Sequence, residues 1–560
     1  MRDGASGTLR GLVQARIAAA FQGANGGSQA PARDVLNATD IEVVRPQLAE
    51  HGDFSTNLAM KLAGPLRQPP RKIAEALVQH LNAGPEDELI ARAEVAGPGF
   101  VNVWLASRHV ERSLDDIRAN ATTYGAAPTE HPKSINVEFV SANPTGPLTV
   151  GNARGAFVGD LLCRVLEAVG HKVTREYYFN DSGAQVEKLG LSIRAIRAGD
   201  EVPEDGYHGD YVKELASQVP DEVLHLAEAT PVRTGWVYGE WASERIREGI
   251  EASLERLGVQ FDVWKGEGSL HTEGWVERGI DQLKVSGHMY ENDGALWFRS
   301  TAFGDDKDRV VIRSNGEPTY FASDIGYVVE KFSRGFDELI YIWGADHHGT
   351  IARLKNAAEA LGFDRDAVNV LLIAWVRFVR DGEEMSMSKR AGEFVRLDEL
   401  LEEVGVDAAR WSFASRAPST GIDFDIELAR KQSAENPVYY VQYAHARIAS
   451  MLRKAADEGL RAADSLDGAL AADDIALALA KELLQLPDIV LDAAAERQTQ
   501  AITTFATELA TKFHSFYRDR HVVDKDDPQT SAVRLALVDA VRITLARSLG
   551  LLGISAPESM

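Results

Sequence analysis

Cysteine is almost absent from this chain of 560 residues, because Cys163 is the only one. A single thiol can form neither an internal disulfide nor a zinc site built from several thiolates. We therefore expect a cytoplasmic protein in a reducing compartment, with no metal held by its side chains. Cys163 itself is interpreted as a small buried residue on an amphipathic helix.

Long apolar runs are also missing. No continuous apolar stretch approaches the roughly 20 residues that a membrane-spanning helix needs. The first 21 residues mix Arg2, Asp3, Arg10 and Arg16 with small residues, so they lack the apolar core of a secretory signal. These absences predict a protein that makes no use of a membrane.

Positive charge is in short supply, since 60 Lys and Arg face 84 Asp and Glu and the formal net charge is -24. Net charge alone argues against a polyanionic partner, but nucleic-acid binding depends on a local basic surface. From residue 501 onward, Lys and Arg equal Asp and Glu in number, so this region is neutral while the rest is acidic. Composition therefore permits a nucleic-acid partner without demonstrating one.

The chain is too long for one hydrophobic core, and its patterns predict three domains. Residues 1–125 mix a helix at 72–81 with a strand at 100–104, which indicates a small α+β domain. After about 425 the pattern is helical, so 426–560 is expected to form a bundle. An apolar stripe at spacings of three and four marks the buried face of one of its helices: Ile502, Phe505, Leu509, Phe513 and Phe516.

The middle region, 133–425, alternates apolar strands with amphipathic helices. This alternation predicts an α/β domain with a doubly wound, parallel, nucleotide-binding sheet of the Rossmann type. Residues from about 200 to 290 interrupt the pattern and are expected to form a largely helical insertion. The strands are expected at 135–140, 173–179, 339–343 and 368–374.

The first segment with a chemical signal runs from Val137 to Asp160 as strand, turn and helix. Gly151 lets a ligand approach the backbone closely, and the N–H groups at the start of a helix attract phosphate. Taken alone, such a segment is equally an ordinary turn.

A second segment, Met385 to Gly392, lies some 235 residues further along. Its hydroxyls and Lys389 suit a loop that closes over a triphosphate and neutralises charge at the α-phosphate and pyrophosphate. A lone lysine in a loop is, however, usually just solvated.

A third segment, Gly344 to Gly349, follows a buried strand at the edge where open α/β sheets bind ligands. Asp346 is placed to accept hydrogen bonds from ribose hydroxyls. The adjacent His347 and His348 point in different directions and lack a third ligand at a telling spacing, so zinc is not expected.

These segments, in this order, resemble the class I aminoacyl-tRNA synthetases, whose signatures are His-Ile-Gly-His and Lys-Met-Ser-Lys-Ser. The resemblance is specifically to the arginyl enzymes at residues 137–147, 175–181, 258–264, 435–444 and 551–558. It implies ATP-dependent ligation of L-arginine to its tRNA through an arginyl-adenylate, with release of AMP and pyrophosphate. ATP, Mg²⁺ and an arginine tRNA are the implied ligands, and we expect a monomer.

Arginine recognition needs carboxylates that engage a planar guanidinium and further acceptors for the α-amino group. Tyr320 and Asp324 lie four residues apart, and so on one side of a helical turn. Since lysine would leave part of a two-carboxylate site unpaired, we expect selection without proofreading and a non-editing insertion. A surface ion pair is the ordinary alternative for each acid. The arginine pocket implied by the family motifs is Glu138, Ser141, Asn143, Tyr320 and Asp324.

The resemblance also assigns the nucleotide and tRNA sites. Phe100 and Asn102 are expected to stack on and hydrogen-bond an unpaired base of the tRNA elbow, with Phe100 as a core residue being the alternative. The helical domain is expected to bind the anticodon. The implied catalytic residues are Thr149, Gly151, Asn152 and Lys389, and the implied ATP-binding residues are Leu148, Thr149, Gly151, Asn152, Gly344, Asp346, His347, Met387, Ser388 and Lys389.

The signatures depart from the family pattern. Thr149 and Asn152 replace both histidines of the first signature, and Ser386 and Arg390 alter the second. Neutral donors remain, so phosphate contacts could survive with weaker charge stabilisation. The departures support an alternative hypothesis: a catalytically impaired, tRNA-binding or regulatory paralogue. The retained active-site groups argue against it: Glu138, Tyr320, Asp324, Asp346 and Lys389.

Overall fold

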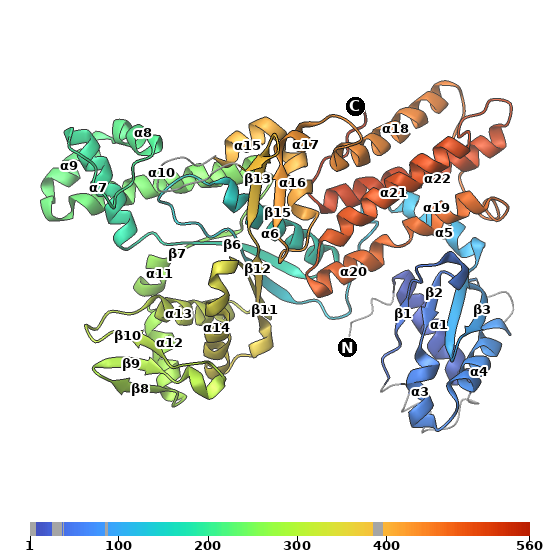
Figure 1. The fold of residues 1–560 in the computed structure, drawn as a ribbon, viewed down its shortest axis with the longest axis horizontal. Helices are drawn as coiled ribbons and strands as arrows, with labels where there is room; N and C mark the ends of the chain where they lie inside the picture. The colour runs from blue at the N-terminus through green and yellow to red at the C-terminus, as the bar shows by residue number, and fades with distance from the viewer. Residues whose placement is uncertain (1–6, 25–35, 37–38, 84–87, 385–395) are drawn as a thin grey trace. The chain divides into compact units, whose positions relative to one another are not determined.

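The computed structural model describes residues 7–24, 36, 39–83, 88–384 and 396–560. The chain forms two compact units, drawn in Figure 1. One unit contains Met1–Pro132, Ala168–Gly170 and Ser433–Met560, and the other contains Lys133–Glu167 and His171–Gln432. The regions expected as the first and last domains therefore pack together in a single unit.

The N-terminal part of the first unit is a small α+β fold. Its antiparallel sheet has the order β1-β2-β4-β3. Alternate residues of β4 are buried, since Val101, Val103 and Leu105 are at most 4% exposed. The predicted helix at 72–81 and strand at 100–104 are confirmed. The elements are α1 Leu9–Ala24, β1 Val43–Val44, β2 Phe54–Thr56, α3 Leu58–Leu66, α4 Pro70–Asn82, β3 Ile90–Ala96, β4 Phe100–Leu105 and α5 Ser107–Ala119.

The C-terminal part of the first unit is a bundle of long helices, coloured orange to red in Figure 1. All five residues of the predicted apolar stripe on α21 are at most 2% exposed, which confirms that the stripe is bundle core. The helices are α18 Pro437–Asp457, α19 Asp474–Leu483, α20 Leu486–Glu496, α21 Gln500–Asp519 and α22 Pro528–Leu551.

Helix α5 joins these two parts. The buried Glu111 carboxylate accepts hydrogen bonds from the N–H groups of Gly468 and Leu470, both at 2.7 Å. One turn further along α5, Asp115 accepts from the Ser465 hydroxyl at 2.8 Å. Backbone N–H groups that would otherwise be buried without partners are thus satisfied by carboxylates, which fixes the N-terminal fold to the bundle.

The second unit is built on a parallel sheet with the order β12-β11-β5-β6-β7. The chain runs outward from β5 in one direction and later from β11 in the other, so the switch point lies between β5 and β11. Open α/β sheets bind ligands at the carboxyl ends of such strands. The expected α/β class is confirmed. The strands are β5 Ser134–Glu138, β6 Lys172–Phe179, β7 Val263–Gly266, β11 Glu338–Gly344 and β12 Val368–Ile373, with the helices α6 Val150–Ala168, α13 Tyr320–Ser333 and α14 His348–Ala360.

Helices α7 to α10 form the insertion and gather together in Figure 1. Helices α7 and α10 pack very closely, because a Cβ on Gly190 would lie 1.8 Å from the Gly235 carbonyl oxygen. The helical part is shorter than the expected 200–290, since β7 within that range pairs with β6 and belongs to the sheet. The helices are α7 Ala184–Ala198, α8 Asp210–Gln218, α9 Asp221–Ala229 and α10 Thr234–Arg256.

The remaining elements complete the second unit. A small antiparallel sheet has the order β10-β9-β8, and another small sheet has the order β14-β13-β15. Within the described ranges, no helix has the length and apolarity needed to cross a membrane. The elements are α11 Glu267–Thr272, α12 Trp275–Val285, β8 Met289–Asn292, β9 Ala295–Phe298, β10 Arg309–Ile312, β13 Val376–Arg380, β14 Glu383–Glu384, α15 Leu397–Val404, α16 Val406–Ala414, β15 Ile422–Asp425 and α17 Ile426–Arg430.

Candidate active site

The turn that follows β5 is strained. Val140 and Ser141 have φ values of 67° and 43°, in the left-handed region that a β-branched residue rarely adopts. The Tyr177 hydroxyl fixes the turn, donating to the Ala142 carbonyl at 2.8 Å and accepting from its N–H at 3.1 Å. Strain of this kind is concentrated at functional sites, and this turn carries Ser141 at the switch point of the sheet.

Glu138, at the end of β5, already has a cationic partner. Lys331 Nζ lies 2.6 Å from Glu138 Oε2, and the Ser141 hydroxyl donates to Oε1 at 3.3 Å. Burial raises the pKa of the Glu138 carboxyl, while Lys331 opposes that shift. Glu138 and Ser141 are therefore brought together as the sequence suggested, but the partner Lys331 was not expected.

Asp324 is a partly buried acid on α13. Its carboxylate forms no ion pair or hydrogen bond with any side chain or backbone group of the described chain. The pKa of Asp324 is raised to about 7. Burial is the main cause, Arg353 opposes it, and the neighbouring Glu138 and Glu267 add to it. Asp324 is thus a partly buried carboxylate without an ion-pair partner among the described residues.

Glu267 is a second such acid, and sequence reasoning missed it. It begins α11 directly after β7, is 7% exposed, and accepts a hydrogen bond from the Ser323 hydroxyl at 3.1 Å. Burial, and then Glu267 and Asp324, raise the pKa of Tyr178. Glu267 has no ion pair with a described cation. Its position after a parallel strand was the available signal, because that edge binds ligands.

The other two residues of the expected arginine pocket have more exposed side chains. Tyr320 is 72% exposed, one turn before Asp324 on α13. Asn143 is exposed and held in place, since its Nδ2 donates to Gln185 Oε1 at 2.9 Å and its Oδ1 accepts from Asn180 N at 3.2 Å. Both are available to a ligand.

The first signature forms a small hydrogen-bonded turn at the start of α6. Asn152 Oδ1 accepts from both the N–H and the hydroxyl of Thr149, each at 3.1 Å. The two residues that replace the family histidines therefore bond to each other. Leu148 and Thr149 are buried, while Gly151 is exposed in the first turn of the helix, where backbone N–H groups suit an anion.

The residues that follow the second signature lie beside the first signature. Leu397 N donates to the Leu148 carbonyl at 3.1 Å, and Arg396 pairs with Thr149 in an isolated antiparallel bridge. Residues nearly 250 positions apart in sequence thus lie side by side. Met387, Ser388 and Lys389 themselves lie outside the described residues.

The third segment lies at the carboxyl end of β11. Gly344, Asp346 and His347 are all exposed, and His347 Nε2 lies 3.7 Å from Asp346 Oδ2. A Cβ on Gly344 would lie 2.5 Å from Asp346 Oδ1, so this glycine makes room for the aspartate. The residues that the structure describes contain no cluster of three His, Cys, Asp or Glu suited to a metal ion.

The outer face of β4 carries the residues expected to contact the tRNA elbow. Phe100 is 40% exposed, whereas Asn102 is 6% exposed and its Oδ1 accepts from the Ser55 hydroxyl at 2.8 Å. Trp104 follows on the same face, with the Arg92 guanidinium 3.8 Å from its ring centre. This face offers ring surfaces and a cation, which suit unpaired bases.

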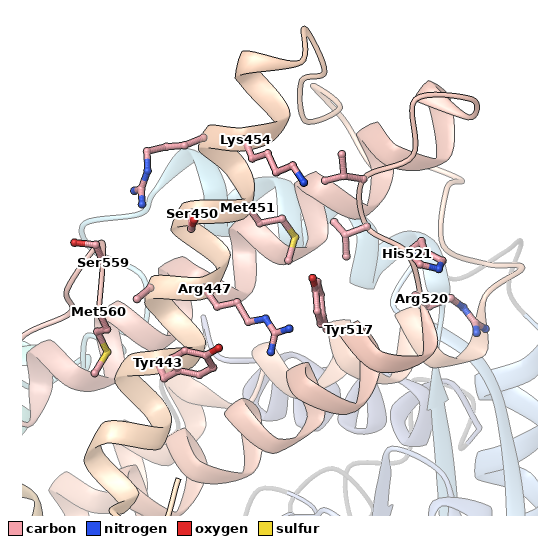
Figure 2. A pocket seen from close by; sticks show the side chains of 14 residues that line it. Tyr443, Arg447, Ser450, Met451, Lys454, Tyr517, Arg520, His521, Ser559 and Met560 are labelled. Atoms are coloured by element: carbon pink, nitrogen blue, oxygen red, sulfur yellow. The ribbon is translucent and has the colours of Figure 1, made fainter. Parts of the chain in front are cut away.

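The helical bundle contains a cavity of about 590 Å³ between α18, α21 and the last residues of the chain. The Arg447 guanidinium lies 4.1 Å from the centre of the Tyr517 ring, and Figure 2 shows the two side chains pointing toward each other. Lys454 adds positive charge, whereas the Arg520 guanidinium is paired with Asp473, with Nε 2.9 Å from Oδ2. The other lining residues are Tyr443, Ala446, Ser450, Met451, Arg453, His521, Val522, Val523, Ser559 and Met560.

Three family models match consecutive parts of the chain. They are an arginyl tRNA synthetase N terminal domain at residues 8–105, the catalytic domain of tRNA synthetases class I (R) at 113–420, and a DALR anticodon binding domain at 441–560. These matches agree with the small α+β fold, the parallel sheet and the helical bundle.

Individual proteins are similar over nearly the full length. An arginine–tRNA ligase of Moorella thermoacetica is 47% identical over 529 residues, which cover 93% of this chain and 94% of the relative. The Bacillus subtilis arginine–tRNA ligase is 43% identical over 531 residues, with coverage of 93% and 94%. The structure of a Thermus thermophilus arginyl-tRNA synthetase superposes with a TM-score of 0.77 at 25% identity, covering 99% of this chain and 100% of that one.

Proposed function

The chain belongs to the arginyl-tRNA synthetases, and from that premise we propose how its residues ligate L-arginine to tRNA at the expense of ATP. The reaction passes through an arginyl-adenylate and releases pyrophosphate and AMP. The protein acts in the cytoplasm as a monomer on an arginine tRNA.

The guanidinium of arginine binds between Asp324 and Glu267. The observation that carries this assignment is that Asp324 and Glu267, which interact with each other electrostatically, form no ion pair with a described cation, whereas Glu138 is paired with Lys331. A planar guanidinium engages two carboxylates, and lysine would leave one of them unpaired. Selection against lysine then needs no second, hydrolytic site, so the insertion of α7 to α10 has another role.

The α-amino group of arginine binds at the strained turn after β5. The Glu138 carboxylate supplies charge there, and Ser141 and Asn143 supply acceptors. Tyr320 covers the site from the first turn of α13. The fixed positions of Asn143 and Ser141 support this assignment, because pre-positioned groups lose little entropy when substrate binds.

ATP binds across the carboxyl ends of β5 and β11. Its phosphates lie near Gly151 and the N-terminus of α6, with Leu148, Thr149 and Asn152 shaping the turn. Its ribose lies near Gly344, Asp346 and His347. Mg²⁺ arrives on the phosphates of the nucleotide.

The arginine carboxylate then attacks the α-phosphate in line and pyrophosphate leaves. The family motif assigns Lys389, Met387 and Ser388 to the triphosphate, where the Lys389 charge stabilises the departing pyrophosphate. A hydroxyl of the terminal adenosine of the tRNA next attacks the adenylate carbonyl and displaces AMP. The anchoring of Arg396 and Leu397 against the first signature supports this pairing of the two segments.

Two surfaces of the first unit bind the tRNA. The face of β4 that carries Phe100 and Asn102 stacks on the elbow. The cavity around Arg447 and Tyr517 takes an unpaired base of the anticodon loop, since ring faces and a cation favour a base over a base pair.

An aminoacylation assay with total tRNA and each of the twenty amino acids tests the proposal. We expect arginine alone to be charged, in the presence of ATP and Mg²⁺. Lys389→Ala should lower the turnover rate by about a hundredfold or more while changing arginine affinity little. Tight binding of tRNA without charging of any amino acid would instead establish the impaired, tRNA-binding paralogue.

A further inference from the structure

The side chain of Lys331 is completely buried. It is 0% exposed, lies on α13 two turns beyond Asp324, and places Nζ 2.6 Å from Glu138 Oε2. The rings of Tyr327 and Tyr341 flank the ammonium group at 4.3 and 4.1 Å from their centres. Burying an ammonium costs several kcal/mol after relaxation, so its place beside the substrate site calls for an explanation.

The neighbouring acid, Glu176, has an ion-pair partner of its own, although Lys331 also helps to lower its pKa. Glu176 on β6 binds Arg334, whose Nη1 lies 2.7 Å from Glu176 Oε2. Glu176 also accepts hydrogen bonds from Asn136 Nδ2, at 2.8 Å, and from the Tyr327 hydroxyl. Arg334 also pairs with the buried Glu330, at 3.1 Å, so it is shared between two acids. Lys331 is the cation whose ion pair is with Glu138.

We propose that Lys331 is a positioning residue for amino-acid binding: it keeps Glu138 charged and oriented so that Oε1 faces Ser141 and the substrate. This inference rests on the proposed function. Lys331 occupies Oε2 from the side opposite Ser141, and its burial keeps it from touching the substrate itself. The Glu138 oxygen that remains then attracts the ammonium group of arginine.

Loss of Lys331 would change the charge of Glu138. Burial favours the neutral carboxyl, and the pKa of Glu138 is raised even with Lys331 in place. Without Lys331 the pKa of the Glu138 carboxyl would rise further, so more of it would be neutral at any given pH, and a neutral carboxyl does not attract an ammonium group. The other titratable groups that interact with Glu138 are Glu176, Tyr178, Asp324, Tyr327 and Tyr341.

Lys331→Met keeps the length of the side chain and removes its charge. We expect the KM for arginine to rise about tenfold or more, which corresponds to a loss of about 1.4 kcal/mol or more, with the KM for ATP and for tRNA unchanged. In this variant the KM for arginine should fall again as the pH is raised, because Glu138 regains its charge. The unaltered protein should reach its lowest arginine KM at a lower pH than the variant.

Lys133→Met is the matched control. Lys133 Nζ lies 3.3 Å from Glu338 Oε2, so it also pairs with a buried glutamate of the same sheet, but at the amino ends of the strands. We expect this variant to keep the arginine KM of the unaltered protein. A folded Lys331→Met variant with an arginine KM within twofold of the unaltered value, at every pH, would overturn the proposal.

A double variant covers the case in which Lys331→Met does not fold. Lys331→Met combined with Glu138→Gln leaves no unpaired charge, and it is compared with Glu138→Gln alone. If Lys331 acts through Glu138, the two proteins should have the same arginine KM. A further tenfold loss in the double variant would contradict the proposal.

The proposed function is tested separately, on the unaltered protein. If that protein charges no tRNA with arginine, the proposed function fails. If it charges arginine and the lysine variant is unchanged, only the role of Lys331 fails.

Discussion

The proposed arginine pocket of the parallel-sheet unit and the cavity of the helical bundle differ in the chemistry that they offer to a ligand. Asp324 is partly buried and Glu267 is buried, and neither forms an ion pair with a described cation. In the bundle, Arg447 lies over the Tyr517 ring in an open cavity lined by mixed side chains. Charges interact strongly in a low dielectric, whereas stacking and cation–π contacts contribute one to a few kcal/mol. From this difference we expect that one substitution in the pocket greatly weakens arginine selection. Affinity for the RNA should instead be divided among many contacts, so that each substitution in the bundle costs little.

The largest expected effect is that of Asp324→Asn. It leaves the guanidinium with one carboxylate, and truncating one partner of a buried charge pair costs about 2–5 kcal/mol. We expect kcat/KM for arginine to fall about a hundredfold or more, with the KM for tRNA unchanged. Steady-state aminoacylation measures both. An intact arginine KM would remove Asp324 from the pocket.

Glu267→Gln should have a smaller effect of the same kind. Glutamine keeps an acceptor for the Ser323 hydroxyl, so the pocket keeps its shape and loses one charge. We expect the arginine KM to rise about thirtyfold, roughly 2 kcal/mol. Glu317→Gln, on an exposed turn of the same unit, is the control. Equal KM values for the two variants would show that Glu267 does not touch arginine.

The pH dependence of arginine binding follows from Asp324. Its pKa is raised to about 7 in the protein without substrate, so the carboxyl is increasingly neutral below that pH and charged above it. Arginine binds the charged form, and the KM for arginine should therefore rise about tenfold per pH unit below about 7 and level off above it. Asp324→Asn should remove this slope. The KM for tRNA, measured across the same range, should not follow it.

Tyr517→Ala tests the bundle cavity. Base–aromatic stacking contributes about 1–3 kcal/mol per base, so we expect the KM for tRNA to rise about tenfold. The KM for arginine should stay the same. Tyr517→Phe keeps the ring and should retain most of the tRNA affinity. A cavity that binds no RNA would leave both variants unchanged.

Phe100→Ala should have the smallest effect of the five. Phe100 is only partly exposed, and Trp104 and Arg92 continue its face, so we expect the KM for tRNA to rise about threefold to tenfold. Phe100→Tyr should restore it. Destabilisation of the small sheet, with no change in tRNA affinity, would mean that Phe100 serves the core instead.

Local periodicity carried most of the sequence-based prediction of the fold. The stripe from Ile502 to Phe516 needed only helical spacing to be recognised as bundle core, and β11 and β12 needed only continuous apolar runs. The four-residue strand β7 is too short for such a signal, so it was included in the helical insertion. The packing of the N-terminal fold with the bundle depends on contacts between distant segments, which no local pattern contains.

For the candidate site, too, local motifs were predictable from the sequence and contacts between distant segments were not. Motif resemblance predicted Glu138, Ser141 and Asp324 as site residues, but it did not predict the cation that pairs with Glu138. Lysine is almost never fully buried unless it is paired, and the partner of Lys331 is 193 residues away. Helical spacing was a usable signal, because Asp324 and Lys331 are seven residues apart and therefore share a face of α13.

The carboxylates of α5 fix the distance between the two proposed tRNA-binding surfaces of the first unit. Glu111 and Asp115 connect the sheet that carries Phe100 to the helices that carry Tyr517, so this distance is set by the protein. If the Phe100 surface binds the elbow and the Tyr517 cavity binds the anticodon loop, the unit selects tRNAs by the distance between these two parts. A tRNA whose anticodon stem is one base pair too long would then bind to either surface but not to both at once.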